Sequence, residues 1–378
     1  MRELYFDHNA TTPLAPEVLQ AMAPLLNEDF GNPSSGHAWG LAAKEALEAA
    51  RNQVADLIHA TPAEIHFFSC ATEANNTVLF GLLSQGGHLA VSAVEHPSVL
   101  GPARELERRG VRLSVLPVGR DGVLDIPQAQ ATLSPDTRLV SVMLANNETG
   151  AIQPVWELSA PCRACGAALH TDAAQAVGKI PVDVRALGVD YLTIAGHKLN
   201  APKGIGALFV RKGCALPPLL FGGGQEQGLR PGTENVAFCV GLGASCAVAG
   251  KRMEEEMARR RSLGDVLLDG LYRLGVDFMV FSEQAQRLPN TLLAGFRNLP
   301  AGRIVEGLAL RDVAVSAGAA CHGPDQGELS HVLAAMHAPR DYALGAVRFS
   351  WGQGSTNDDA LELVSRLGKI FNDLKAAG

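Results

Sequence analysis

The chain has 378 residues, of which 47% are hydrophobic, and this length exceeds what one hydrophobic core usually serves, so we expect two domains. Its 39 acidic and 32 basic side chains give a net charge of −7, which argues against nucleic acid as a direct partner. The N-terminus lacks the pattern of a signal peptide and no run of eighteen apolar residues occurs, so we expect a cytoplasmic protein without membrane contact. Seven cysteines spread along such a chain do not predict a disulfide framework.

Between about residues 60 and 215, short apolar runs alternate with polar or glycine-bearing turns and with segments that suit a helix. This alternation is typical of βαβ units and predicts an α/β fold with a mostly parallel sheet between helices. Runs that are apolar throughout indicate strands covered on both faces. The expected strands are residues 64–68, 88–94, 139–145, 167–173, 189–195 and 206–210.

The chain changes character after about residue 260. Helical stretches are expected at 262–274 and 358–374, and short strands near 290–296 and 345–352, which together predict a smaller α+β domain. The extended N-terminal segment lacks a core of its own and is expected to pack onto this second domain. We therefore predict a large domain of residues 17–259, and a small domain of residues 1–16 and 260–378.

Polar motifs follow several of the predicted strands directly. They read "SCATEANN", "EHPS", "NNETG" and "GHK". In open α/β sheets, ligands bind beyond the carboxyl ends of the strands. The motifs are therefore expected to meet in one crevice, although tens of residues separate them along the chain.

Two charged residues in this predicted crevice suggest pyridoxal phosphate (PLP) chemistry. Lys198 follows an apolar strand and precedes a loop rich in Pro and Gly, where a desolvated amine becomes available for Schiff-base formation. Asp172 ends another apolar run, where a carboxylate needs a partner, and the protonated ring nitrogen of PLP is one. Taken singly, Lys198 also fits a surface lysine near a turn, and Asp172 a turn aspartate.

A phosphate group would suit the start of the helix predicted after "SC", because Ala71 and Thr72 would present free backbone N–H groups to an anion. The glycines of "FGGGQEQG" lack the strand-to-helix frame of a dinucleotide site, so dinucleotide binding is not expected.

A cysteine stands in a segment that suits a surface loop. Residues 315–332 read "VSAGAACHGPDQGELSHV", in which Cys321 follows small residues and precedes Gly323 and Pro324. Free cysteine is usually buried, so a thiol displayed on a loop is unusual and suggests a reactive group. The alternative is a loop cysteine without a role.

The motifs as a set resemble the cysteine desulfurases of the NifS/IscS type over nearly the whole chain. The resemblance implies a fold-type I PLP enzyme of the class V aminotransferase group, a homodimer with its active site near the subunit interface. It implies removal of sulfur from L-cysteine, with alanine as product and a persulfide on Cys321. The matching segments are "YFDHNATTP", "GNPSSGH", "ATEANN", "EHPSV", "NNETG", "HTDAAQAVGK", "GHKLNAPKGIGALFVRKG", "GGGQEQGLRPGTENV" and "RLPNTL".

The resemblance also implies roles for individual residues. Lys198 would bind the cofactor covalently, His96 would stack on its ring and assist proton transfer, and Asp172 would hold the pyridinium. Arg348 would clamp the carboxylate of the substrate, where a bidentate guanidinium suits the geometry. The other residues implied are Asn147 and Gln175 at the cofactor or substrate, Ala71, Thr72 and His197 at the phosphate, and Thr233 of the partner subunit.

Two positions depart from the family pattern. Ala195 stands where the family usually has a serine, and Thr193 would then have to supply the missing phosphate hydroxyl. His322 follows Cys321, and "AACH" resembles selenocysteine lyases as much as desulfurases.

Three alternatives follow. They are a selenocysteine lyase, another class V enzyme such as an aminotransferase, and a thiol or metal-binding protein that uses Cys162 and Cys165. An aminotransferase would give the loop thiol no task, and a single CxxC motif is weak evidence of a metal site. A sulfur acceptor, such as a scaffold protein for iron–sulfur assembly or a thiolation pathway component, is expected as partner, but the sequence does not identify it.

Overall fold

The computed structural model describes residues 2–318 and 329–376. Its larger sheet has seven strands in the order β2-β8-β7-β6-β5-β3-β4. All neighbouring strands are parallel except at β8, which is antiparallel to both β2 and β7. The predicted α/β fold with a mostly parallel sheet is thereby confirmed. The strands are β2 (Ile65–Phe68), β3 (His88–Ser92), β4 (Arg112–Leu116), β5 (Thr137–Ser141), β6 (Ala168–Asp172), β7 (Tyr191–Ala195) and β8 (Gly206–Val210).

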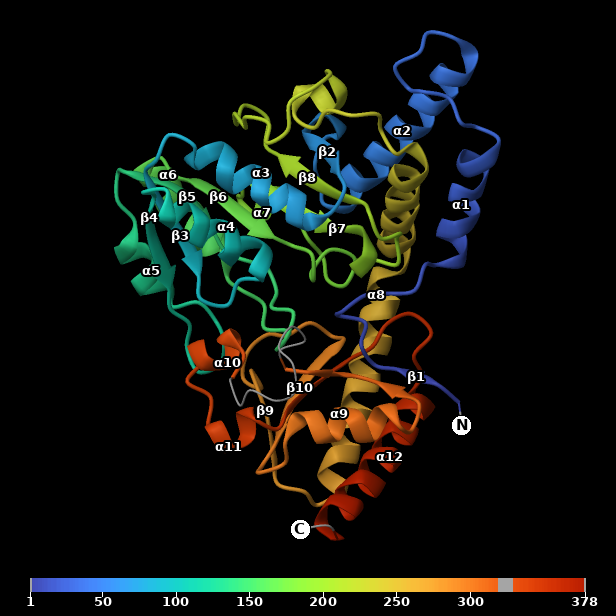
Figure 1. Ribbon diagram of the computed structural model, residues 1–378, viewed down its shortest axis with the longest axis vertical. Coiled ribbons are helices and arrows are strands. Elements are labelled where there is room, and N and C mark those ends of the chain that lie inside the picture. Colours follow the sequence, from blue (N-terminus) through green and yellow to red (C-terminus); the bar gives the residue numbers. More distant parts are fainter. Residues whose placement is uncertain (1, 319–328, 377–378) are drawn as a thin grey trace.

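Helices cover both faces of this sheet, so strands β2, β6 and β7 are buried along almost their whole length (Figure 1). One face packs against α2 (Ala38–Leu57), α6 (Ser159–Cys165) and the start of α8 (Val236–Arg273). The other face packs against α3 (Ala71–Leu83) and α4 (Pro97–Arg108). Shorter helices in this part of the chain are η1 (Pro62–Glu64), α5 (Ile126–Thr132), η2 (Val155–Leu158), α7 (Val184–Leu187), η3 (Gly196–Lys198) and η4 (Gln225–Gly228).

A second, antiparallel sheet forms the other end of the molecule, in the order β12-β13-β10-β9. Its strands are β9 (Phe278–Val280), β10 (Thr291–Phe296), β12 (Ser316–Ala317) and β13 (Ala346–Ser350). The second half of α8, α9 (Ala301–Ala309) and α12 (Asn357–Ala376) bury its apolar face in a separate core. Two short helices, α10 (His331–Ala335) and α11 (Arg340–Ala343), complete this end.

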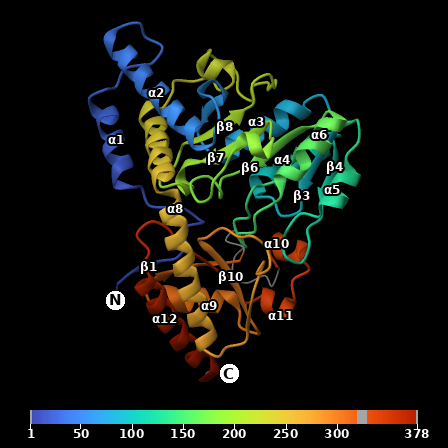
Figure 2. The same ribbon diagram turned by 180° about the vertical axis from the view of Figure 1, so that it is seen from behind.

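The N-terminal segment lies on the second sheet's end of the molecule, as expected. Strand β1 (Leu4–Tyr5) pairs in parallel with β11 (Val313–Ala314). The chain then passes to α1 (Pro16–Asn27), which packs on α8 beside α2. Figure 2 shows this path from behind, where the N-terminal strand lies near α12 and α1 lies beside the upper part of α8. The segment between β1 and α1 therefore connects the two ends of the molecule.

Helix α8 also connects the two ends, and the predicted boundary between residues 259 and 260 lies inside it. The helix has 38 residues, packs against α1 and α2 at its start, and packs against α12 near its end (Figure 1). Its first part has a mean hydropathy of 1.3, which by length and composition alone would allow it to cross a membrane. Buried core helices of many proteins share that property.

A buried ion pair holds the glycine-rich segment after β8 against α2 and β2. Nη1 and Nη2 of Arg51 donate to the Glu226 carboxylate at 2.7 and 2.9 Å, and the backbone N–H of Phe67 donates to the same carboxylate at 2.8 Å. Glu226 has a left-handed φ of 48°, a conformation that costs energy in a residue with a side chain. The ion pair therefore stabilises an unusual turn at a fixed place.

Candidate functional site

The predicted site residues come together at one edge of the larger sheet. Asp172 is the last residue of β6, and Lys198 ends η3, which directly follows β7. His96 precedes α4 after β3, and Thr72 lies in the first turn of α3 after β2. The carboxyl ends of these strands therefore meet, as the motif positions predict.

Asp172 is buried and its carboxylate is fully hydrogen-bonded. Its Oδ2 accepts from Asn75 Nδ2 at 2.8 Å, and its Oδ1 accepts from the backbone N–H of Ala174 at 2.9 Å. These two donors fix the position of the carboxyl group at the end of β6. Asp172 also opposes the effect of burial on His96 and His170, because its negative charge raises the pKa of each imidazole.

The amine of Lys198 is held by backbone carbonyls of the N-terminal segment. It donates to the carbonyl oxygen of Asn9 and, at 2.7 Å, to that of Ala10. Gln175 Nε2 donates to the same Asn9 carbonyl at 3.0 Å. The segment that joins the two ends of the molecule thus fixes the position of the lysine.

A second lysine lies beneath this arrangement. Lys179 is buried, and its Nζ donates to Gln175 Oε1 at 2.6 Å and to Asn9 Oδ1 at 3.1 Å. Burial, assisted by the positive charge of Lys198, lowers the pKa of the Lys179 amine well below its usual value. Lys179 therefore acts as a buried hydrogen-bond donor that orients Gln175 and Asn9.

Two histidines border the site. Burial lowers the pKa of His96, and the cations of Lys198 and His331 lower it further. Burial, together with the cations of Lys198, Lys203 and Lys179, lowers the pKa of His197 to about 4. Both imidazoles are therefore neutral near pH 7 and can act as hydrogen-bond donors or acceptors.

The start of α3 offers unused backbone donors. Its N-cap residue, Cys70, makes no side-chain cap, and the N–H groups of Ala71, Thr72 and Glu73 have no hydrogen-bond partner among residues 2–318 and 329–376. Gly206 lies directly against this turn, since a Cβ there would come within 3.1 Å of Ala71 N and 2.7 Å of Ile194 O. A phosphate would find here both a helix N-terminus and close backbone approach.

The donor set fits pyridoxal phosphate. The buried Asp172 carboxyl group suits the ring nitrogen, a lysine amine lies at the same sheet edge, and a helix N-terminus with free N–H groups suits the phosphate. The hydroxyl of Thr193, by contrast, already has a partner, because Thr193 Oγ1 lies 3.1 Å from Nε2 of the buried His170. This contact joins two neighbouring strands of the sheet, β6 and β7.

Arg348 lies in β13, buried beside the site, and its guanidinium has partners within the chain. Nη1 donates to the backbone oxygen of Asn147 at 2.9 Å and Nη2 donates to Asp7 Oδ1 at 2.8 Å, while the buried Nε has no hydrogen-bond partner within residues 2–318 and 329–376. Glu148 is also buried here, and burial raises its pKa to about 7. A substrate carboxylate at Arg348 would therefore compete with Asp7.

Three predicted residues stay unassigned by these contacts. Thr233 is exposed and makes no hydrogen bond with the described part of its own chain. Cys321 and His322 lie outside the described residues. Helix α10, which follows that segment, is anchored at the site, because His331 Nε2 lies 2.8 Å from the backbone oxygen of Glu95.

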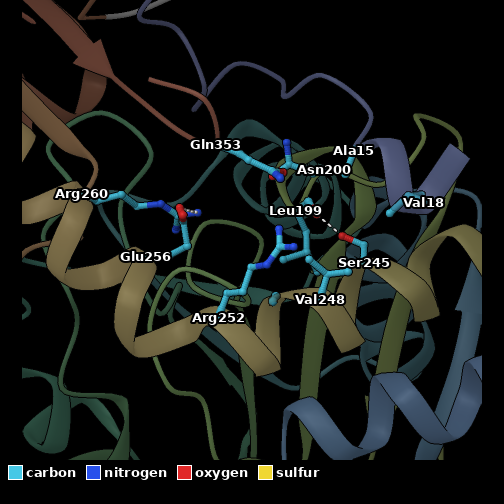
Figure 3. A pocket seen from close by; sticks show the side chains of 12 residues that line it. Ala15, Val18, Leu199, Asn200, Ser245, Val248, Arg252, Glu256, Arg260 and Gln353 are labelled. Carbon is cyan, nitrogen blue, oxygen red and sulfur yellow. Dashed lines mark hydrogen bonds and ion pairs between the residues drawn. The ribbon is translucent and has the colours of Figure 1, made fainter. Parts of the chain in front are cut away.

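The small cavity of Figure 3 is a separate feature between α8 and the residues that follow Lys198. Its volume is about 40 Å³, and Leu199, Asn200 and the α8 residues Arg252 and Glu256 are among those that line it. Ser245 closes one side by donating to the backbone oxygen of Leu199. This volume suits water molecules and is too small for a cofactor.

Comparison with known proteins agrees with this geometry. The aminotransferase class-V family model matches residues 4–363. The chain is 42% identical to cysteine desulfurase IscS of Dictyoglomus turgidum, over 99% of this chain and 96% of that protein. It belongs to the cysteine desulfurase family. Another relative in this family is a cysteine desulfurase of Mus musculus, 41% identical over 95% of this chain and 79% of that protein.

Solved structures of this family agree with the fold. A NifS-like protein superimposes with a TM-score of 0.92 at 34% identity, covering 98% of this chain and 100% of that chain. SspA, solved in complex with cysteine, superimposes with a TM-score of 0.81 at 32% identity, covering 92% of this chain and 98% of that chain. The predictions of family and fold are thus confirmed.

Sequence reasoning did not single out Asn9, Asn75 or Lys179. Each stands inside a motif that was recognised, namely "YFDHNATTP", "ATEANN" and "HTDAAQAVGK". Their roles depend on partners far away in the sequence, so position within a motif was the only signal available.

Proposed function

We propose that the protein is a PLP-dependent cysteine desulfurase. Sulfur would pass from L-cysteine to the thiol of Cys321, so that L-cysteine and the thiol give L-alanine and a persulfide on Cys321. The carbon–sulfur bond breaks, a sulfur–sulfur bond forms, and the methyl group of alanine takes up a proton, so no external oxidant is needed. The observation that carries this proposal is the meeting of Asp172, Lys198 and the open start of α3 at one sheet edge.

The cofactor would be held by residues already in place. Asp172 would face the ring nitrogen, the N–H groups of Ala71 and Thr72 would bind the phosphate, and Lys198 would carry the aldehyde carbon. When bound, PLP withdraws electrons from the α-carbon of an amino acid. Asn147 and Gln175 would contact the cofactor or the substrate, and Thr233 would reach the phosphate of the partner subunit.

Other side chains would position the substrate and move its protons. Arg348 would bind the carboxylate of cysteine, and its unpartnered buried Nε supports a further hydrogen bond there. His96 would lie over the cofactor ring, with Lys198 near enough to act on its pKa. The solved complex of SspA with cysteine supports the choice of substrate class.

The protein would work as a homodimer in the cytoplasm. Large apolar side chains are exposed on the segments around α1 and α2 and after β8, including Phe30, Trp39 and Phe221. The described cysteines are all unpaired thiols, which suits a reducing compartment. A sulfur-accepting or scaffold protein would then take the persulfide sulfur, for iron–sulfur assembly or thiolation.

A selenocysteine lyase is the second candidate, because His322 follows Cys321 and gives the "AACH" sequence that also resembles those enzymes. Selenium leaves carbon more readily than sulfur and depends less on an attacking thiolate. The two candidates therefore differ in how much they need Cys321.

The deciding experiment measures alanine release from L-cysteine and from selenocysteine by wild type and by Cys321→Ala. We expect wild type to act on cysteine and Cys321→Ala to lose that activity by at least about a hundredfold. Cys165→Ala, which removes another thiol far from the site, is the matched control and should keep full activity. Wild type that acts on selenocysteine alone would favour the second candidate.

A further inference from the structure

The imidazole of His96 is held in one orientation by its neighbour two residues on. The backbone N–H of Ser98 donates to His96 Nδ1 at 3.1 Å, and Ser98 Oγ lies 2.8 Å from the same nitrogen. A backbone N–H can only donate, so Nδ1 must be the acceptor. The neutral imidazole therefore carries its proton on Nε2.

The direction of the Ser98 hydroxyl follows from its other partner. Asn75 Nδ2 donates to Ser98 Oγ at 2.9 Å and to Asp172 Oδ2 at 2.8 Å. Both partners accept from the same amide nitrogen, which fixes the orientation of the Asn75 amide. Ser98 Oγ is thus an acceptor toward Asn75, and its own proton points to His96 Nδ1.

These contacts form a continuous path with each donor assigned. Asn75 and Ser98 are both buried, so water does not compete for their hydrogen bonds. The path runs from Asp172 through Asn75 and Ser98 to His96, and it joins β6, α3 and the start of α4. We propose that Ser98 and Asn75 are positioning residues that hold His96 in its Nε2–H tautomer and link it to Asp172.

The path has a consequence for protonation of His96. A second proton on the ring would place Nδ1–H against the Ser98 N–H, and the Ser98 hydroxyl would have to turn away. The charged groups that face His96 are Asp172 from β6, which favours the imidazolium, and Lys198 from η3 and His331 from α10, which oppose it. The hydrogen bonds to Nδ1 also disfavour the imidazolium, so His96 stays neutral and donates through Nε2.

The inference deepens the proposed function, since it assigns the tautomer of the histidine placed over the cofactor ring. It is tested on PLP-loaded protein with ¹⁵N-labelled histidine, whose ring nitrogen shifts report tautomer and protonation across pH. His96→Gln identifies the His96 signals. We expect an unprotonated Nδ1 in wild type near pH 7.

In Ser98→Ala, which removes one donor to Nδ1, we expect the His96 titration midpoint to move upward by about 0.5 to 1 pH unit. Ser98→Thr keeps the hydroxyl and should restore the wild-type midpoint. Ser141→Ala is the matched control, because Ser141 Oγ lies 2.8 Å from Nδ1 of another buried histidine, His170. That variant should leave the His96 midpoint unchanged.

A proton on Nδ1 in wild type, or an unchanged midpoint in Ser98→Ala, would overturn the inference. If Ser98→Ala does not fold, Ser98→Cys replaces it, because a thiol is a weaker donor and should move the midpoint in the same direction. Failure of the proposed function shows separately, as a protein with the expected His96 signals that releases no alanine from cysteine.

Discussion

Asp172 combines two tasks that depend on its charge. Its oxygens accept from Asn75 Nδ2 and from the N–H of Ala174, and the proposed cofactor would add a pyridinium partner. An amide in its place would turn one N–H group toward an existing donor and could not balance a positive ring nitrogen. The charge of the side chain, more than its shape, is therefore what the site requires.

We expect Asp172→Asn to keep the fold and some PLP but to lower alanine release by about 10²–10³-fold, the usual cost of losing one electrostatic contact to the reacting group. Steady-state kinetics and the visible absorbance of bound PLP would measure the two effects separately. Asp56→Asn, an exposed aspartate on α2, is the control and should match wild type. Near-normal turnover in Asp172→Asn would show that another carboxylate holds the ring.

Glu95 is a buried carboxyl group that makes the free energy of unfolding depend on pH. It is fully buried, and burial raises its pKa to about 8, although Ser92 Oγ and the N–H of Met143 donate to its Oε1. Between about pH 4.5 and 8 the folded protein holds this proton while the unfolded chain releases it. Its contribution to stability is therefore greatest below pH 4.5 and is lost as the pH rises toward 8.

Glu95→Gln should remove that loss, because the amide keeps the acceptor oxygen and never ionises. Denaturant titration at pH 6 and at pH 9 gives the free energy of unfolding of each protein. Between these two pH values we expect that free energy to fall less in the variant than in wild type, and the two decreases should differ by an amount on the order of a few kcal/mol. Glu107→Gln changes an exposed carboxylate and should show the wild-type difference. Equal pH dependence in Glu95→Gln and wild type would contradict the assignment.

At the scale of single elements, the first turn of α3 depends on the strand beside it. Gly206 begins β8 and pairs with Phe68 at the end of β2 and with Ala195 at the end of β7. The backbone of Cys70 and Ala71 lies so close that a Cβ at residue 206 would have to displace it. The absence of a side chain at Gly206 is thus part of the proposed phosphate site.

Gly206→Ala should therefore weaken PLP binding by about tenfold or more, since the N–H groups of α3 would shift away from the phosphate. Titration of the apoprotein with PLP, followed by absorbance, gives the dissociation constant. Gly101→Ala is the matched control, because a Cβ on that exposed turn of α4 meets nothing within 4 Å. The idea fails if both alanine variants bind PLP like wild type.

At the scale of the whole molecule, two of the most exposed apolar side chains fall at one end. Phe221 is 89% exposed and Phe30 is 74% exposed, on the loops near α2 at the top of Figure 1. Leu310 is also 78% exposed but follows α9 at the other end. A homodimer formed through the end that carries Phe221 and Phe30 would bury both side chains and would bring Thr233 of each chain toward its partner.

We expect Phe221→Glu to shift the protein from dimer toward monomer and to reduce PLP retention, because a buried unpaired charge opposes association. Analytical ultracentrifugation across protein concentration measures the shift. Leu310→Glu adds the same charge to an equally exposed position and should leave the dimer intact. A stable dimer in both variants would place the interface elsewhere.

Much of this protein could be read from local sequence. The alternation of apolar runs with polar turns determined the parallel sheet, because strands buried on both faces must be apolar throughout. The position of Asp172 and Lys198 directly after such runs placed them at the carboxyl edge, since chain direction in a parallel sheet is fixed. Those positions predicted the sheet edge that carries the site, whereas the family was predicted from the resemblance of nine motifs to cysteine desulfurases.

The tertiary structure alone decided the contacts between residues that are far apart in the chain. Asn9 reaches Lys198 because the N-terminal segment crosses between the two ends of the molecule, and no local pattern reports such a path. The hydroxyl of Thr193 lies 3.1 Å from Nε2 of His170, because neighbouring strands set which side chains meet, while its proposed contact with the phosphate stays a prediction. The path from Asp172 to His96 likewise depends on how three elements, β6, α3 and the start of α4, pack against one another. A hydrogen bond is made or lost when the distance between two atoms changes by a few tenths of an ångström, and only the packed chain fixes distances that closely.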